Sequence, residues 1–449
     1  MTSSHRTFGL RLLPVGTGLL AAVTVLAAAL SRWVPDGLAS LDRFVLASLA
    51  GFVSLLLLAA SKFDVLVLLT FCLLGFVRTE PAPVDALSVA LLPIGFLLGR
   101  LSLETLAGAT LLHLTVWGFL MTNVLELWPN ASFDESLRYT TITFYLLAFA
   151  YFVRLYLTDR KAVHVVLLGY SISVLLSCVL LGLGYLGAVD GTLFIQERRA
   201  MAFFKDPDVF GPFPIMMVLL LLNDVWHPRS RLIAGPSLVK VLGAVLCTVA
   251  IVLSFSRAAI INLTVALLVY LVLNLRELSA RRLGWLLGLA VLVVGALEGT
   301  LSQLGLTEFL WGRASLQPYD TDRFATHARG IDIGLSHLLG IGPGMLERAH
   351  SLYIRTFAEY GVFGALFLCS AIALVVARVL GCAIRESGKP LGPLVSVVGA
   401  CLVGMLVNSL VIDTLHWRQF WFIWALAWGV ADVAARDELP RRLRANAVC

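Results

Sequence analysis

Charged side chains are scarce in this sequence. They make up 14% of its 449 residues, whereas apolar residues make up 59%. A soluble domain has about 25% charged residues, and no part of this chain has such a polar composition. Apolar runs long enough to cross a bilayer recur from one end to the other. We therefore expect an all-α, polytopic integral membrane protein with about 12–14 transmembrane helices.

Several motifs of soluble enzymes are also missing. The seven cysteines are scattered and form no CxxC pair, so the sequence indicates neither a disulfide framework nor a thiolate metal site. There is no P-loop, GxSxG or HExxH motif. The predicted outer segments contain two Asp-x-Asp triplets, at 206–208 and 320–322, but no larger acidic cluster to hold a divalent ion. We expect no metal, no cofactor and no nucleic-acid partner.

The apolar runs predict the course of the chain. The first run is too long for the core of a signal peptide, so we interpret it as the first span. Four regions follow from the pattern: N-terminal transmembrane helices (1–195), transmembrane helices with basic outer loops (196–299), a large outer helical loop (300–360), and C-terminal transmembrane helices with a basic cytoplasmic tail (361–449). The predicted spans lie near 10–31, 44–60, 63–77, 84–99, 105–126, 139–157, 163–187, 208–224, 238–254, 258–275, 284–299, 361–380, 392–412 and 419–435.

Lysines and arginines predict the orientation. A cytoplasmic N-terminus places 20 of the 34 inside, and nine of the other 14 are concentrated in three outer segments. Membrane insertion favours lysine and arginine on the cytoplasmic side. Cations that occur on the outer side nevertheless indicate that an anion binds there, such as a phosphate or a carboxylate. The nine are Arg198, Arg199, Lys205, Arg257, Arg313, Arg323, Arg329, Arg348 and Arg355.

The first outer segment is QERRAMAFFKDPDVFGPFP, residues 196–214. Its cations Arg198, Arg199 and Lys205 are interleaved with aromatic residues before a proline turn. Arginine suits multidentate binding of phosphate oxygens. The alternative is that these side chains reach the membrane interface as simple anchors.

The second outer segment is LSFSRAAIINL, residues 253–263. Ser254 or Ser256 can cap a helix that begins near Arg257. The free N–H groups of that helix end would add to the arginine charge and make an anion site. An interfacial anchor is the alternative.

The third outer segment contains TDRFATHARGIDIGLSHL, which predicts an amphipathic helix capped by Thr321 or Asp322. Arg323 and His327 lie four residues apart and would share one face of that helix. The turn GIGPG follows, and MLERAHSLYIRTFAEYG then predicts a short helix that carries His350 in its first turns.

His350 is a candidate general base, because histidine titrates near neutral pH. The other histidines sit in or beside spans, in inside segments, or at a helix end where they would favour the helix dipole. Arg355 and Glu359 lie four residues apart, so a simple ion pair along the helix is the alternative to a functional role for them.

These motifs, in this order, resemble the core of the O-antigen ligase and polymerase superfamily. That core has Ser-x-Ser-Arg, then Gly-hydrophobic-Gly-Pro-Gly, then Ala-His-Asn followed by Tyr-Leu and Glu-x-Gly-x-x-Gly. RRAMAFFKDPDVFG is similar to its upstream element, and the matched elements span about 196–365. Ser351 stands where the family usually has Asn, and Asp208 stands near the usual Asn after Pro207.

The resemblance implies a membrane glycosyltransferase of the bacterial inner membrane, with its active site facing the periplasm. It would move a glycan from undecaprenyl pyrophosphate to lipid A–core without metal and with inversion, while membrane lipids surround the bundle. The residue roles that it implies are His350 as base, Arg198, Arg199, Arg257, Lys205 and Arg323 as pyrophosphate ligands, and Arg348, Glu359 and Tyr353 as acceptor-binding or orienting residues.

Two other functions remain open. A polymerase would use the same residues on another lipid-linked glycan. A transporter of lipid-linked glycans would need the arginines but no base. The basic segment 300–360 favours the ligase, because lipid A–core is rich in phosphate.

Overall fold

The computed structural model describes residues 58–446, apart from 128–132, 228–232, 234, 278, 316–317, 347–348 and 387–388. The span predicted near 10–31, most of the one near 44–60, and Arg348 lie outside the described residues.

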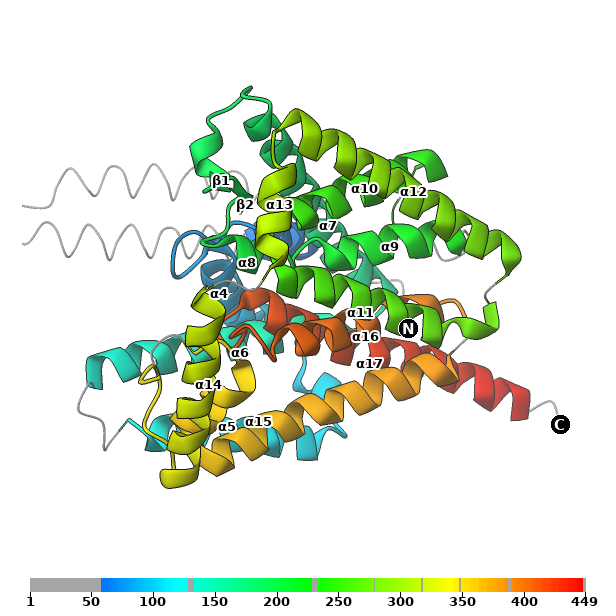
Figure 1. Cartoon of the computed structure of the whole chain (residues 1–449). Coiled ribbons are helices and arrows are strands. Elements are labelled where there is room, and N and C mark those ends of the chain that lie inside the picture. The colour runs from blue at the N-terminus through cyan, green and yellow to red at the C-terminus, as the bar shows by residue number, and fades with distance from the viewer. Residues whose placement is uncertain are drawn as a thin grey trace, which may run out of the picture.

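Helices account for almost all of the described chain (Figure 1). A helix over 58–72 comes first and is followed by α4 (Pro83–Leu97), α5 (Thr110–Leu125), α6 (Phe133–Tyr156), α7 (Arg160–Tyr185), α8 (Pro207–Phe210), α9 (Ile215–Trp226), α10 (Ser237–Leu253), α11 (Arg257–Leu273), α12 (Ala280–Gln303), α13 (Thr307–Ala314), α14 (Pro318–Ser336), α15 (Leu352–Arg385), α16 (Gly392–Asn408) and α17 (Arg418–Asn446).

Three of these helical stretches are long and apolar enough to cross a membrane: α7, Pro207–Trp226 and α15. A fourth results if Gly288–Gln303 and Thr307–Arg313, which are bent by 109°, count as one broken span. The shorter α4, α5, α10, α11 and α16 are apolar as well. The all-α membrane fold is thus confirmed, whereas the number of 12–14 spans stays a prediction.

The centre of the bundle is formed by the C-terminal helices. Helix α16 packs on α11 and α15, α15 also packs along α5, and α17 packs on α6 (Figure 1). Trp421, Trp424 and Trp428 of α17 are fully buried and contact one another edge to face. Aromatic residues on one helix face contribute large buried apolar area, so α17 anchors the core.

Seven ion pairs agree with the predicted orientation. In each of them, both residues come from segments that the sequence places on the same side of the membrane. Inside are Arg154–Asp432, Arg160–Asp437 and Lys161–Asp64, and outside are Arg199–Asp208, Arg257–Asp320, Arg355–Asp413 and Arg418–Asp85.

The outer segment contains the expected amphipathic helix, but its start was predicted wrongly. Helix α14 begins at Pro318, before Thr321 and Asp322, so neither of these residues is its cap. A proline at the first position is already set for the helix and needs no N–H partner there. Helix α14 packs across α15 near the beginning of that helix (Figure 1).

The helix after the GIGPG turn also differs from the prediction. Helix α15 begins at Leu352 with Ser351 as its N-cap, so His350 precedes the helix rather than lying in its first turns. Gly361 has a non-helical backbone, with φ 63° and ψ −169°, so the short helix that starts at Leu352 ends there and a second helical segment continues α15 beyond the kink, as the sequence predicts. The turn is held to α15 by backbone bonds from Ile341 N to Ala358 O (3.1 Å) and from Val362 N to Leu338 O (3.0 Å).

A small hairpin interrupts the helices between α7 and α8. Strands β1 (Ile195–Gln196) and β2 (Arg199–Ala200) pair antiparallel. Glu197 and Arg198 form its two-residue turn with φ values of 49° and 68°. Two successive positive φ values are typical of a type I′ turn, whose twist suits a hairpin.

Candidate functional site: an arginine-lined cavity

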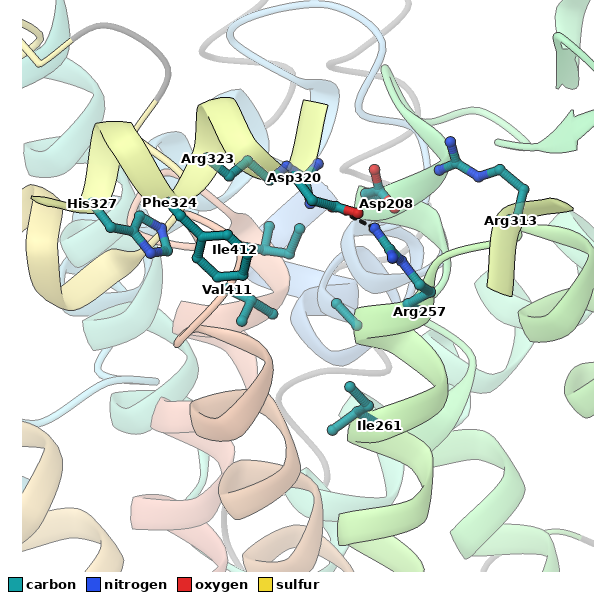
Figure 2. Close-up of a pocket in the computed structure, with 11 residues that line it drawn as sticks. Asp208, Arg257, Ile261, Arg313, Asp320, Arg323, Phe324, His327, Val411 and Ile412 are labelled. Atoms are coloured by element: carbon teal, nitrogen blue, oxygen red, sulfur yellow. Dashed lines mark hydrogen bonds and ion pairs between the residues drawn. The ribbon is translucent and has the colours of Figure 1, made fainter. Parts of the chain in front are cut away.

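One cavity of about 230 Å³ joins helices that are far apart in sequence (Figure 2). Helix α11 forms one wall, α13 and α14 contribute basic side chains, and the loop after α16 closes another side. Its lining residues are Asp208, Arg257, Ala258, Ile261, Arg313, Asp320, Arg323, Phe324, His327, Val411 and Ile412.

Arg257 stands at the first position of α11, as predicted. Ser256 is the N-cap and accepts a bond from Ala259 N at 3.4 Å, which decides between the two serines proposed from the sequence. The guanidinium reaches across the cavity to Asp320 Oδ1 at 2.5 Å (Figure 2). It also donates to Ser315 O at 3.3 Å. A helix start and an arginine therefore contribute positive potential to the same cavity.

Arg199 supports the cavity from behind. Its Nη2 donates to Asp208 Oδ1 at 2.8 Å, and its Nε donates to Ser254 O at 3.0 Å. These bonds connect β2 to α8 and to the end of α10. A Cβ atom on Gly211 would lie 2.7 Å from Ser254 Oγ, so this close approach needs glycine. Asp208, which Arg199 binds, lines the cavity.

Helix α14 places three side chains on the cavity. Arg323, Phe324 and His327 all line it, which confirms that Arg323 and His327 share one face (Figure 2). Nε2 of His327 is buried and has no hydrogen-bond partner among the described residues. A buried ring nitrogen of this kind can accept a proton or hydrogen-bond a ligand hydroxyl.

Arg313, from α13, also lines the cavity (Figure 2). It is one of the nine predicted outer cations, but its position predicted no specific role for it. The one sequence signal for Arg313 was its position in an outer segment that is rich in cations, although such residues usually lie on the cytoplasmic side.

His350 is half-buried and is not one of the eleven residues that line the cavity. The chain next to it is nevertheless bound to the cavity wall: Leu352 N donates to Ser409 O at 3.0 Å, and Ser351 Oγ donates to the same oxygen at 3.4 Å. Val411, which lines the cavity, follows two residues after Ser409. His350 thus directly precedes two residues that are bonded to the segment after α16, which contributes Val411 and Ile412 to the cavity.

Two further predicted site residues, Glu359 and Tyr353, lie outside the cavity lining and make contacts within the protein. Glu359 is fully buried, accepts a bond from Arg355 Nε at 3.1 Å and accepts one from Leu346 N at 3.1 Å. The i,i+4 pair exists, and Arg355 also binds Asp413. Tyr353 donates its hydroxyl to Leu406 O at 3.1 Å.

The remaining two cations lie elsewhere. Arg198 is exposed at the hairpin turn, where its carbonyl oxygen accepts a bond from the Tyr185 hydroxyl at 2.9 Å. Lys205 lines a different cavity and forms an ion pair with Glu80. The predicted grouping of Arg198, Arg199 and Lys205 into one anion site therefore does not describe a single cavity.

The arrangement suits a doubly charged anion. Arg257, Arg313 and Arg323 line the cavity, Arg199 joins it through Asp208, and the acidic side chains there are Asp208 and Asp320. Four cations thus meet two carboxylates. Among the described residues, no three His, Cys, Asp or Glu side chains gather as a metal site.

Comparison with known families places part of the chain. Residues 242–369 match the family described as O-antigen ligase. A search of curated proteins finds no match for the chain. The matched segment includes Arg257, Arg313, Arg323, His327 and His350, which come from the helices around the cavity and from the loop beside it. The match shows similarity to the O-antigen ligase family over this segment and supports a function of ligase or polymerase type.

Proposed function

We propose that the protein transfers a glycan from undecaprenyl pyrophosphate to lipid A–core at the periplasmic face of the inner membrane. The observation that carries the proposal is the convergence of Arg257, Arg313 and Arg323 on one cavity (Figure 2). Three guanidiniums from three helices make a place for concentrated negative charge, which a pyrophosphate supplies.

The arginines would act on the leaving group. As the bond between the sugar and the pyrophosphate breaks, negative charge grows on the phosphate oxygen. Guanidiniums already fixed around that oxygen stabilise the charge without reorganising, which lowers the barrier. They would take the place that a divalent ion has in other transferases, so we expect transfer to continue in EDTA.

An imidazole would take the proton from the acceptor hydroxyl, and attack opposite the leaving group would invert the anomeric carbon. We assign this role to His350, whose neighbours are bound to the cavity wall at Ser409. His327 is the second candidate, because it lines the cavity and its Nε2 has no partner among the described residues.

The test is transfer by purified protein from an undecaprenyl pyrophosphate-linked glycan to lipid A–core. His350→Ala should lower kcat about 100-fold or more while donor binding survives, and His327→Ala should have the smaller effect. The reverse order would move the base to His327. Full transfer by both variants would remove the imidazole from the mechanism.

The proposed role of the cavity arginines can be tested with a matched control variant on the same helix. Arg323→Ala should lower kcat/KM about 100-fold, because Arg323 lines the cavity. Arg329→Ala, at an exposed position of α14, should stay within about twofold of wild type. Equal losses in both variants would contradict a role specific to the cavity.

The same assay separates the alternatives. A ligase makes no longer glycan without lipid A–core, whereas a polymerase extends the lipid-linked glycan itself. A transporter makes no product from either mixture, although it moves the lipid-linked glycan across a vesicle membrane.

A further inference from the structure

A second cavity, of about 170 Å³, shares the short helix α8 with the first, because Asp208 lines one and Val209 the other. Its lining comes from the loop before α4, from residues around Lys205, and from the start of α17. The lining residues are Leu74, Val77, Glu80, Phe204, Lys205, Val209, His416, Trp417, Arg418 and Gln419.

Two hydrogen-bond acceptors on this lining lack a donor. Gln419 is 5% exposed, and its Nε2 donates to Val209 O at 2.8 Å, which leaves Oε1 without a partner among the described residues. Nδ1 of His416 is likewise buried without a partner. Leaving a buried polar atom unsatisfied costs about 1–3 kcal/mol, so each such atom calls for a donor from a ligand or from water.

The neighbours of His416 decide its tautomer. Its Nε2 lies 3.3 Å from Thr143 Oγ1, and that hydroxyl donates to Tyr139 O at 3.1 Å. With the hydroxyl proton used in that bond, the contact is satisfied by the tautomer that carries its hydrogen on Nε2, and this tautomer leaves Nδ1 as an acceptor. Burial, and next the charge of Arg355, lower the pKa of His416 to about 4, which keeps the ring neutral at pH 7.

The cations of this cavity are already matched by carboxylates. Lys205 pairs with Glu80, and Arg418 Nε donates to Asp85 Oδ2 at 2.6 Å. Burial acts to raise the pKa of Glu80, but the bond and charge of Lys205 hold it below the usual range. The groups of this cavity that lack a partner are therefore hydrogen-bond acceptors, and a ligand would satisfy them with donors rather than with negative charge. Hydroxyl groups are donors of that kind, and the Trp417 indole offers an apolar face beside them.

We propose that this second cavity is a saccharide subsite, in which sugar hydroxyls donate to Gln419 Oε1 and His416 Nδ1 while the ring lies against Trp417. The proposal rests on the proposed function for the identity of the substrates. The sugar can come from the glycan donor or from the acceptor, and both present the same chemistry.

The position of the subsite fits a transferase. Consecutive residues of the short helix α8 line the two cavities, since Asp208 lines the first and Val209 lines the second. The segment after α16 does the same, with Ile412 on the first cavity and His416 on the second. A sugar in one and a phosphate in the other would be separated by a single layer of chain.

The test compares two probes for the donor: undecaprenyl pyrophosphate alone and the same carrier with its glycan. Gln419→Met keeps the length of the side chain and removes the acceptor. Trp417→Leu removes the indole. Matched controls are Gln196→Met on the hairpin and Trp117→Leu, whose ring is 55% exposed on α5. The acceptor arm measures KM for lipid A–core.

The expected result is a loss of about threefold to tenfold in affinity for the glycan-bearing donor, or the same rise in KM for the acceptor, with binding of the bare carrier unchanged. The first outcome assigns the subsite to the donor sugar and the second to the acceptor sugar. Unchanged values for both substrates in folded variants would overturn the proposal, as would equal weakening of the bare carrier.

Arg257→Gln separates this proposal from the pyrophosphate site. It should weaken the bare carrier as strongly as the glycan-bearing one. If it has no effect while Gln419→Met keeps its selectivity, the pyrophosphate site is wrong and the saccharide subsite stands.

Discussion

At the scale of single residues, buried polar groups distinguish the two cavities. Arg257 and Asp320 balance each other across the first, whereas Gln419 and His416, which line the second, each keep a buried acceptor without a partner among the described residues. A charged group that already has a partner can exchange it for a ligand, but an acceptor without a donor gains a bond that it lacked. This difference supports the two proposals of a charge-binding first cavity and a hydroxyl-binding second cavity.

His416 makes stability depend on pH. Its pKa of about 4 in the folded protein lies below the usual value of about 6.5, so the unfolded chain binds more protons between these values. The stabilisation is complete above about pH 6.5 and is lost as the pH falls towards 4, by up to about 3 kcal/mol. Arg355 adds to the lowering of the pKa, while Asp413 and Glu80 oppose it.

His416→Gln should therefore flatten the fall in apparent Tm between pH 6.5 and 4, measured in detergent. The difference between wild type and variant isolates this ring from the other groups that titrate in acid. An unchanged slope in the variant would show that the ring does not contribute.

Local signals in the sequence predicted residues whose environment is set by their own helix. Ser256 as a cap and the shared face of Arg323 and His327 follow from spacing along the chain. The ion-pair partners of Asp208 and Lys205 do not follow from spacing, because they depend on which other segment packs beside these residues. Neither spacing nor charge marked Gln419, which became notable only through Val209 on a different helix.

At the scale of elements, the bend in α15 lets the turn before that helix pack closely against it. Gly361 has a backbone conformation that only glycine adopts readily. A Cβ atom there would lie 2.2 Å from Leu338 O, in the turn before α15. The bend and the turn therefore fit only while both lack side chains at this contact.

Gly361→Ala should destabilise the protein by about 2 kcal/mol or more, seen as a lower apparent Tm. Gly299→Ala, on α12 with nothing within 4 Å of the added Cβ, is the matched control and should leave Tm unchanged or slightly raised. A Gly361→Ala protein as stable as the control would refute the need for glycine at the bend.

The sequence predicted most elements because apolar runs and proline or glycine breaks are local. It missed the boundaries that tertiary contacts determine. His350 precedes α15 because Ser351 caps the helix and Leu352 N binds Ser409. That partner lies more than 50 residues away, beyond the reach of any local pattern.

At the scale of the whole molecule, buried ion pairs tie the N-terminal helices to α17. Arg154 of α6 and Asp432 of α17 form a pair in which the side chains are 1% and 6% exposed. Arg378 Nε also donates to Asp432, at 2.5 Å. Burial makes the pair costly to break, because the remaining charge has no water to solvate it.

Asp432→Asn should cost about 3–5 kcal/mol, since it leaves Arg154 without its carboxylate. Asp437→Asn breaks the exposed pair with Arg160 and should cost under about 1 kcal/mol. Unfolding in detergent with added denaturant would measure both. Similar losses for the two variants would mean that burial does not set the strength of these pairs.

The Arg257–Asp320 contact has a consequence for release of the spent carrier. In the proposed reaction, an incoming diphosphate would displace the protein's own carboxylate from Arg257, and that carboxylate would remain on α14, ready to return once turnover is complete. Competition from a tethered anion lowers the net affinity for the bound anion. The proposed site would therefore release the spent carrier faster than a site without Asp320.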